Sequence, residues 1–129
     1  MKRIFILLAL FSLTACTSLK TLVPSFNDPN QSAKIIDVSF AVDKLDCEQP
    51  HAPQVLVIKD NLRWFELYSK SNGFRNQDVL NIIKPMQATV DDFYKRSVEK
   101  QGSKSYCELK KNIMATQARA ASDAVLGRF

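Results

Sequence analysis

The sequence predicts an all-α protein: a small bundle of three to four helices closed by one disulfide, behind a cleaved signal peptide and a flexible tether. Apolar residues recur at helical spacing in three long segments, and two cysteines remain beyond the amino-terminal region. A chain of 129 residues suffices for one ordinary domain. Its apolar content of 46% and charged content of 24% exclude a wholly disordered chain or a multi-span membrane protein.

The amino terminus predicts an export signal over residues 1–15. Lys2 and Arg3 precede the run Ile4–Leu13, which is apolar except for Ser12. Ten residues rise about 15 Å as a helix, roughly half the hydrocarbon thickness of a bilayer. The run is therefore too short for a permanent membrane span.

The end of this run reads Leu13-Thr14-Ala15-Cys16, which resembles the lipobox of bacterial lipoproteins. The resemblance covers the first sixteen residues only. It implies that Cys16 is linked to diacylglycerol, that the preceding peptide is removed and that the new amino group is acylated. Two or three acyl chains anchor a small domain stably, whereas one chain binds only marginally. The alternative makes Cys16 an ordinary thiol behind a conventional signal peptide.

The residue after the cysteine bears on localisation. Lipoproteins kept in the inner membrane of enteric-type bacteria often carry Asp there, so by resemblance Thr17 implies sorting to the outer membrane, facing the periplasm. Processing leaves 16 basic and 13 acidic residues, a mild excess that does not indicate nucleic-acid binding. Six bases and two acids between Lys95 and Lys111 are typical of a solvated face, or alternatively of a surface for an acidic partner or anionic headgroups.

Residues 16–32 are expected to form the lipidated cysteine and a flexible tether, because turn-forming residues such as Pro24, Asn27 and Pro29 dominate after Val23. The folded domain is then residues 33–129. Cys47 and Cys107 are expected to form a disulfide across it, since paired cysteines in a small exported domain usually do. A metal centre fails on ligand count, because one His and two thiols do not fill a structural zinc site.

Three segments of this domain predict helices. They are Pro53–Asn72, a segment capped by Asn76 or Asp78, and Ser103–Leu126. Pro85 predicts a kink or a break in the second. The apolar stripes expected to face the core are Val55, Ile58, Leu62 and Phe65 in the first, Val79, Ile82, Ile83, Met86, Val90 and Phe93 in the second, and Tyr106, Leu109, Ile113, Ala120 and Ala124 in the third.

The segment Ala33–Leu45 fits two structures. As a strand it alternates Ile36, Val38, Phe40 and Val42 with polar or small residues. As a helix it aligns Ile35, Val38, Val42 and Leu45. A short hairpin around Gln49–Pro53 would be needed to pair such a strand. Helix is favoured.

Residues that carry catalysis are sparse. His51 lies between Pro50 and Pro53 and is expected in a turn, and no serine stands in a G-x-S-x-G setting. Asp91 and Asp92 diverge by about 100° on a helix and do not share a site. The sequence therefore predicts no enzyme activity, no cofactor and no small-molecule substrate.

A second stripe on the Pro53–Asn72 helix, formed by Val57, Trp64 and Tyr68, is the candidate protein-binding surface. It lies about 120° from the core stripe, whereas a surface helix needs only one such stripe. Trp and Tyr are enriched at interface hot spots. The alternative is a central helix packed against two neighbours, which would bury both stripes.

In its size, lipid anchor, helical content and internal disulfide, the chain resembles the pilotins of bacterial secretion systems. These small lipoproteins bind the end of an outer-membrane secretin subunit and carry it to the outer membrane. The resemblance implies a non-enzymatic protein-binding accessory or assembly module. The alternative is an envelope lipoprotein of phage or prophage origin, such as an outer spanin subunit or an exclusion protein.

Overall fold

The computed structural model describes residues 28–73 and 76–128. The expected signal peptide, the lipidation site Cys16 and the tether up to residue 27 lie outside the described residues.

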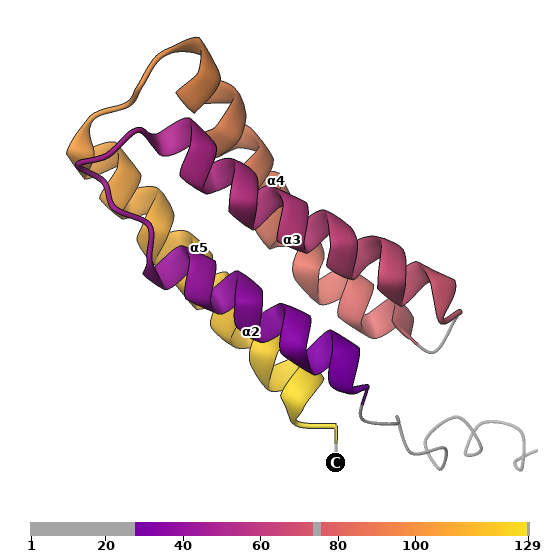
Figure 1. Ribbon diagram of the computed structural model, residues 1–129. Coiled ribbons are helices and arrows are strands. Elements are labelled where there is room, and N and C mark those ends of the chain that lie inside the picture. Colours follow the sequence, from indigo (N-terminus) through magenta and orange to yellow (C-terminus); the bar gives the residue numbers. More distant parts are fainter. Residues whose placement is uncertain (1–27, 74–75, 129) are drawn as a thin grey trace, which may run out of the picture.

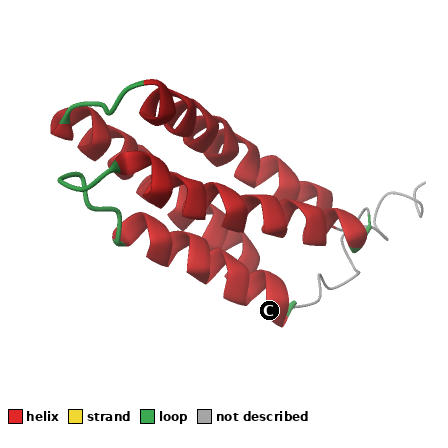
Figure 2. Cartoon of the chain, turned by 45° about the horizontal axis from the view of Figure 1, so that its top comes forward, coloured by secondary structure: helices red, strands yellow, loops and turns green. Residues whose placement is uncertain are grey.

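Four helices make up the described part of the chain: α2 (Pro29–Asp43), α3 (His51–Ser71), α4 (Gln77–Glu99) and α5 (Lys104–Leu126). They run side by side with short connections (Figure 1). Helix α2 packs on α3 and α5, and α4 packs on the same two helices. The result is an antiparallel four-helix bundle in which helices that follow one another are neighbours. Figure 2 shows only helices and loops across the described residues, so the predicted all-α bundle is confirmed.

The core consists of one buried seam per helix, with spacings that alternate between three and four residues. This average of 3.5 is the heptad pattern of helices that cross at a shallow angle. In α3 the seam is His51, Val55, Ile58, Leu62, Phe65 and Ser69, and in α2 it is Gln31, Ile35, Val38 and Val42. The core stripes expected in these two helices are therefore confirmed.

Helix α2 resolves the ambiguity of residues 33–45 in favour of helix, but it begins earlier than expected. Asp28 caps it, its side-chain Oδ1 accepting from the backbone N–H of Asn30 (2.9 Å) and of Gln31 (3.3 Å). Pro29 occupies the first helical position, where its missing N–H costs nothing. Residues 29–32 thus belong to the folded domain, and their assignment to the tether was wrong.

His51 was expected in a turn, and this is also wrong. It is the first residue of α3 and is fully buried. Its Nε2 lies 3.2 Å from the carbonyl oxygen of Cys47, and its ring centroid lies 5.8 Å from that of Phe93. Pro50 and Pro53 therefore flank a helix start, and the alternative hairpin does not form.

Helix α4 runs unbroken through Pro85, so the expected break does not occur. Pro85 lies on the exposed side of the helix, where the Asn81 carbonyl that loses its partner can reach water. Five of the six residues of the expected stripe are buried. The exception is Ile82, which is exposed because it lies off the seam of Val79, Ile83, Met86, Val90 and Phe93.

Helix α5 buries a different face from the one expected. Leu109, Ile113 and Ala120 are exposed. The buried seam is Cys107, Met114, Ala118, Ala121 and Val125. The disulfide accounts for the difference, because Cys107 must point inward to reach Cys47 in the middle of the α2–α3 loop.

That disulfide is present, as predicted. The two sulfur atoms are 2.07 Å apart, and the bond joins residues 60 positions apart in the sequence. It ties the α2–α3 loop to the first turn of α5 and so closes one end of the bundle.

Candidate functional site

The candidate surface is built around two stacked rings on α3. The rings of Trp64 and Tyr68 are 4.9 Å apart between centroids and lie 9° from parallel. Trp64 is 42% exposed and Tyr68 is half-buried. Trp64 therefore does not belong to the core, and the alternative in which both stripes of α3 are buried is wrong.

Contacts from α2 fix these rings. The Tyr68 hydroxyl donates to Asp28 Oδ1 (3.2 Å) and accepts from Asn30 Nδ2 (2.9 Å). The Lys34 ammonium lies 5.1 Å from the Trp64 ring centre and also pairs with Asp37 at 3.0 Å. Trp64 is thus partly exposed, while Tyr68 of α3 and Lys34 of α2 set its position.

Val57 extends this area along α3. It is 54% exposed and lies two helical turns before Trp64, hence on the same side of the helix. Leu67 is also exposed and lies one helical turn after Trp64 on the outward side of α3. It was not among the residues predicted for this surface from the sequence. Its spacing of three residues from Trp64 is the signal that would have included it. We call Val57, Trp64, Leu67 and Tyr68 the α3 surface.

Two exposed apolar residues of α2, Ile36 and Phe40, were also not identified as surface residues from the sequence. The Lys44 ammonium lies 4.3 Å from the Phe40 ring centre. Both residues lie off the buried seam of α2, so their exposure follows from the same periodicity that buries Ile35 and Val38.

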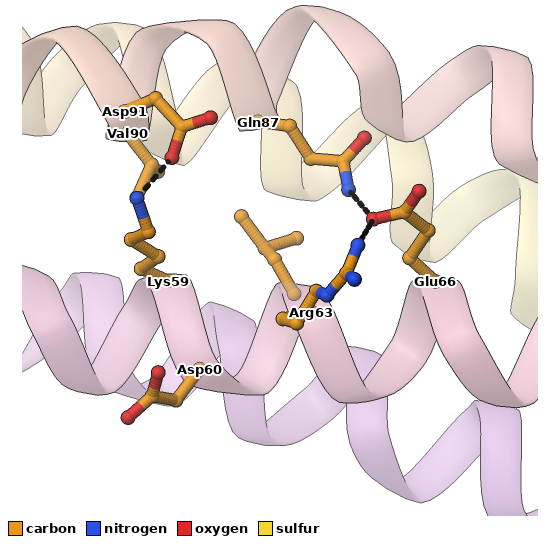
Figure 3. A pocket seen from close by; sticks show the side chains of 8 residues that line it. Lys59, Asp60, Arg63, Glu66, Gln87, Val90 and Asp91 are labelled. Atoms are coloured by element: carbon orange, nitrogen blue, oxygen red, sulfur yellow. Dashed lines mark hydrogen bonds and ion pairs between the residues drawn. The ribbon is translucent and has the colours of Figure 1, made fainter.

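A surface groove of about 430 Å³, lined mainly by charged side chains, runs between the packed helices α3 and α4. Its floor is apolar, formed in part by Leu62 and Val90. In Figure 3, Lys59 reaches Asp91 (2.8 Å) on one side, and Gln87 and Arg63 reach Glu66 on the other.

Glu66 is the most heavily hydrogen-bonded group in this groove. It accepts from Lys70, from Arg63 at 3.1 Å and from Gln87 at 3.0 Å. These bonds, that from Lys70 foremost, lower the pKa of the Glu66 carboxyl against the opposing effect of burial. The arrangement holds a carboxylate firmly ionised, and a carboxylate held in this way is poorly suited to take up a proton.

The bases between Lys95 and Lys111 are largely occupied by partners in the same molecule. Arg96 and Lys110 both bind Asp92, at 3.0 and 2.7 Å. Lys104 binds Glu48 at 2.6 Å. Lys111 donates to the carbonyl oxygens of Asp43 and Leu45, both at 2.8 Å. This pairing favours the solvated-face interpretation of the segment over a surface for an anionic partner.

Asp91 and Asp92 diverge as expected for neighbours on a helix. Asp91 pairs with Lys59 of α3, whereas Asp92 pairs with Lys110 of α5. Hydrogen bonds from Lys110 and then Arg96 lower the pKa of Asp92 to about 2. The two carboxylates thus hold α4 to both of its neighbours.

Within residues 28–73 and 76–128, no group of three or more His, Cys, Asp or Glu side chains is placed to hold a metal ion. No described helix combines the length and apolar character needed to cross a membrane. Comparison of the chain with protein-family models, with curated proteins and with solved structures gave no match.

Proposed function

We propose that this protein is a lipoprotein anchored in the outer membrane, facing the periplasm, that acts as a non-enzymatic, pilotin-like module for binding and assembling a protein partner. The exposed stack of Trp64 on Tyr68 is the observation that carries the proposal. Val57, Trp64 and Leu67 are exposed together on α3, and a group of exposed apolar side chains is typical of a protein-binding surface.

The geometry of the stack favours binding. Trp and Tyr contribute large contact areas with few rotatable bonds, so they dominate interface hot spots. Here Asp28, Asn30 and Lys34 hold the rings before any partner arrives. A partner therefore gains contact area without having to order these side chains.

Two features support the cellular location. The Cys47–Cys107 disulfide fits an oxidising compartment such as the periplasm. The tetrapeptide Leu13-Thr14-Ala15-Cys16 supports the lipid anchor, although it lies outside the described residues.

The test is photo-crosslinking in intact cells from a residue of the α3 surface. A benzophenone side chain replaces Val57 in one variant and Val98 in the matched control. Both residues are valines on outer helix faces, 54% and 60% exposed. We expect a discrete crosslinked protein from position 57 and none from position 98. Equal products from both positions, or none from position 57, would contradict the proposal.

A further inference from the structure

We propose that the outward face of α5 is a self-association surface, on which two copies of this chain pair with their α5 helices antiparallel. This face is separate from the α3 surface, so the inference does not depend on the proposed function.

Helix α5 carries a second stripe of uncharged residues besides its buried seam. Leu109, Ile113, Thr116 and Ala120 are all exposed, Leu109 at 56%. Their spacings of four, three and four residues follow the heptad pattern of helices that pack at a shallow angle. Helices α2 and α4 pack on other sides of α5 and leave this stripe without a neighbouring helix among the described residues. The stripe therefore has the period needed to pack against one more helix.

Two unpaired charges flank this stripe. Glu108 and Arg119 are both exposed, and neither forms a hydrogen bond or an ion pair with another described residue. The eleven residues between them make three helical turns and about 20° more, so both side chains lie on the same flank of the stripe. They are about 16 Å apart along the helix axis, which is too far for them to pair within one molecule.

A second copy of the chain satisfies both charges. When two α5 helices run antiparallel with Leu109 opposite Ala120 of the other copy, Ile113 lies opposite Thr116. In this register, Glu108 of each copy lies within about 3 Å, measured along the axis, of Arg119 of the other. The two-fold axis repeats the contact, so one interface contains two such ion pairs. In a parallel pair, the flank that carries both charges faces the opposite flank of the other copy, and the two charges do not meet.

The size of the face indicates reversible pairing. Helix α5 has 23 residues, so it is about 35 Å long, and with its side chains it is about 12 Å across. It therefore offers roughly 400 Å², about half of what each partner buries in a standard interface. Ile36 of α2, 53% exposed, borders this face, because it lies one turn from Ser39, whose hydroxyl bonds that of Ser122 on α5 (3.1 Å). We expect a dimer with a Kd of roughly micromolar or weaker.

The first test is sedimentation velocity of the full chain in a density-matched detergent, from roughly 1 μM to 1 mM, which brackets this Kd. Wild-type protein should show a reversible monomer–dimer equilibrium. Ile113→Asp should raise the Kd at least tenfold, because it places like charges at the centre of the interface. Far-UV circular dichroism checks that the helices are intact.

Val98→Asp is the matched control for this test. Val98 is 60% exposed and lies on the α3 side of α4, one turn after Tyr94, whose ring lies 5.2 Å from the Lys59 ammonium of α3. This variant should leave the Kd unchanged. Wild-type protein that stays monomeric throughout, or an Ile113→Asp variant that dimerises like wild type, would overturn the proposal.

The second test exchanges the flanking charges. Glu108→Arg alone and Arg119→Glu alone each bring like charges together and should raise the Kd roughly fivefold. An equimolar mixture of the two variants should form a heterodimer with a Kd within about twofold of wild type, because one copy then supplies both bases and the other both acids. These differences should shrink in 1 M salt. A mixture that associates no better than either variant alone contradicts the antiparallel register and overturns the proposal.

Other occupants of the face give different results. A benzophenone side chain at position 116 should crosslink a second copy of this chain in cells. Crosslinks only to a different protein indicate a heterologous partner, and crosslinks only to phospholipid indicate the membrane; either result overturns the proposal. Trp64→Ala should leave the dimer Kd unchanged, so this inference and the proposed function fail independently.

Discussion

The Asp28 carboxylate caps α2 and also accepts a hydrogen bond from the Tyr68 hydroxyl, 40 residues away on α3 (3.2 Å). One side chain therefore fixes both the start of the domain and the position of the ring that supports Trp64. The residue that caps the first described helix therefore also positions the candidate binding surface.

Tyr68→Phe should weaken this junction. It removes the bonds to Asp28 and from Asn30, and a net cost of about 1 kcal/mol corresponds to a fall in Tm of roughly 5 °C for a domain of this size. Tyr94→Phe is the control, because no hydrogen bond joins the Tyr94 hydroxyl to another described residue. Equal melting of the two variants would show that the hydroxyl of Tyr68 does not stabilise the domain.

Removal of the disulfide should have a much larger effect. For a closed loop of 60 residues the chain-entropy estimate is about 4 kcal/mol, or roughly 20 °C in Tm. The measurement is thermal unfolding of the double variant Cys47→Ser, Cys107→Ser, with reduced wild-type protein as its control. A double variant that melts close to the oxidised protein would contradict this prediction.

Asp92 should contribute stability that depends on pH. Its pKa is lowered to about 2 from an ordinary value of 3.8, so its contribution is complete above pH 3.8 and is lost as the pH falls towards 2. Asp92→Asn should therefore be less stable than wild type at pH 7, by under about 1 kcal/mol because the side chain is partly exposed.

Chemical denaturation at several pH values measures this difference. It should fall steeply as the pH drops through 2, where the carboxyl is half protonated, and should shrink at pH 7 in 1 M salt, which screens exposed ion pairs. A difference that stays constant from pH 7 to pH 2 would show that the contacts with Lys110 and Arg96 do not depend on the charge of Asp92.

Cys16→Ser tests the lipid anchor. The lipobox predicts that the variant is not processed as a lipoprotein and no longer incorporates labelled palmitate, since the thioether needs the sulfur of Cys16. Membrane fractionation and intact mass provide the readout. Thr17→Ser serves as the control and should be processed normally. A variant that is processed and labelled like wild type would refute the assignment.

Local sequence patterns correctly predicted the core stripe of α3 and the disulfide that closes one end of the bundle. The stripe from Val55 to Phe65 is the more regular of the two apolar stripes on its helix, so its burial followed from the helical period. The Cys47–Cys107 bond followed from the predicted export of the chain and from the pairing of the two remaining cysteines. The exposure of Trp64, in contrast, depended on whether the two helices packed against α3 cover its second stripe as well as its first, and this is a property of the whole bundle.

Three of the errors share one physical cause, which is that tertiary packing overrides local signals; the early start of α2 is instead a local effect of the Asp28 cap. In α5 the larger residues Leu109 and Ile113 suggested the wrong face, because alanines suit a closely packed seam once Cys107 has set the orientation. Pro85 leaves α4 intact since the helix is held by both neighbours. His51 lies in the core because the carbonyl of Cys47 gives its ring a polar partner there.

The central claim is that Trp64 serves binding and not folding, and Trp64→Ala tests it most directly. Its neighbour Phe65 is fully buried, so Phe65→Ala should cost about 3–5 kcal/mol and provides the contrast. For Trp64→Ala we predict melting within about 5 °C of wild type, together with a fall of roughly tenfold or more in the product crosslinked from position 57. A collapse in Tm comparable to that of Phe65→Ala, or an undiminished crosslinked product, would contradict the account.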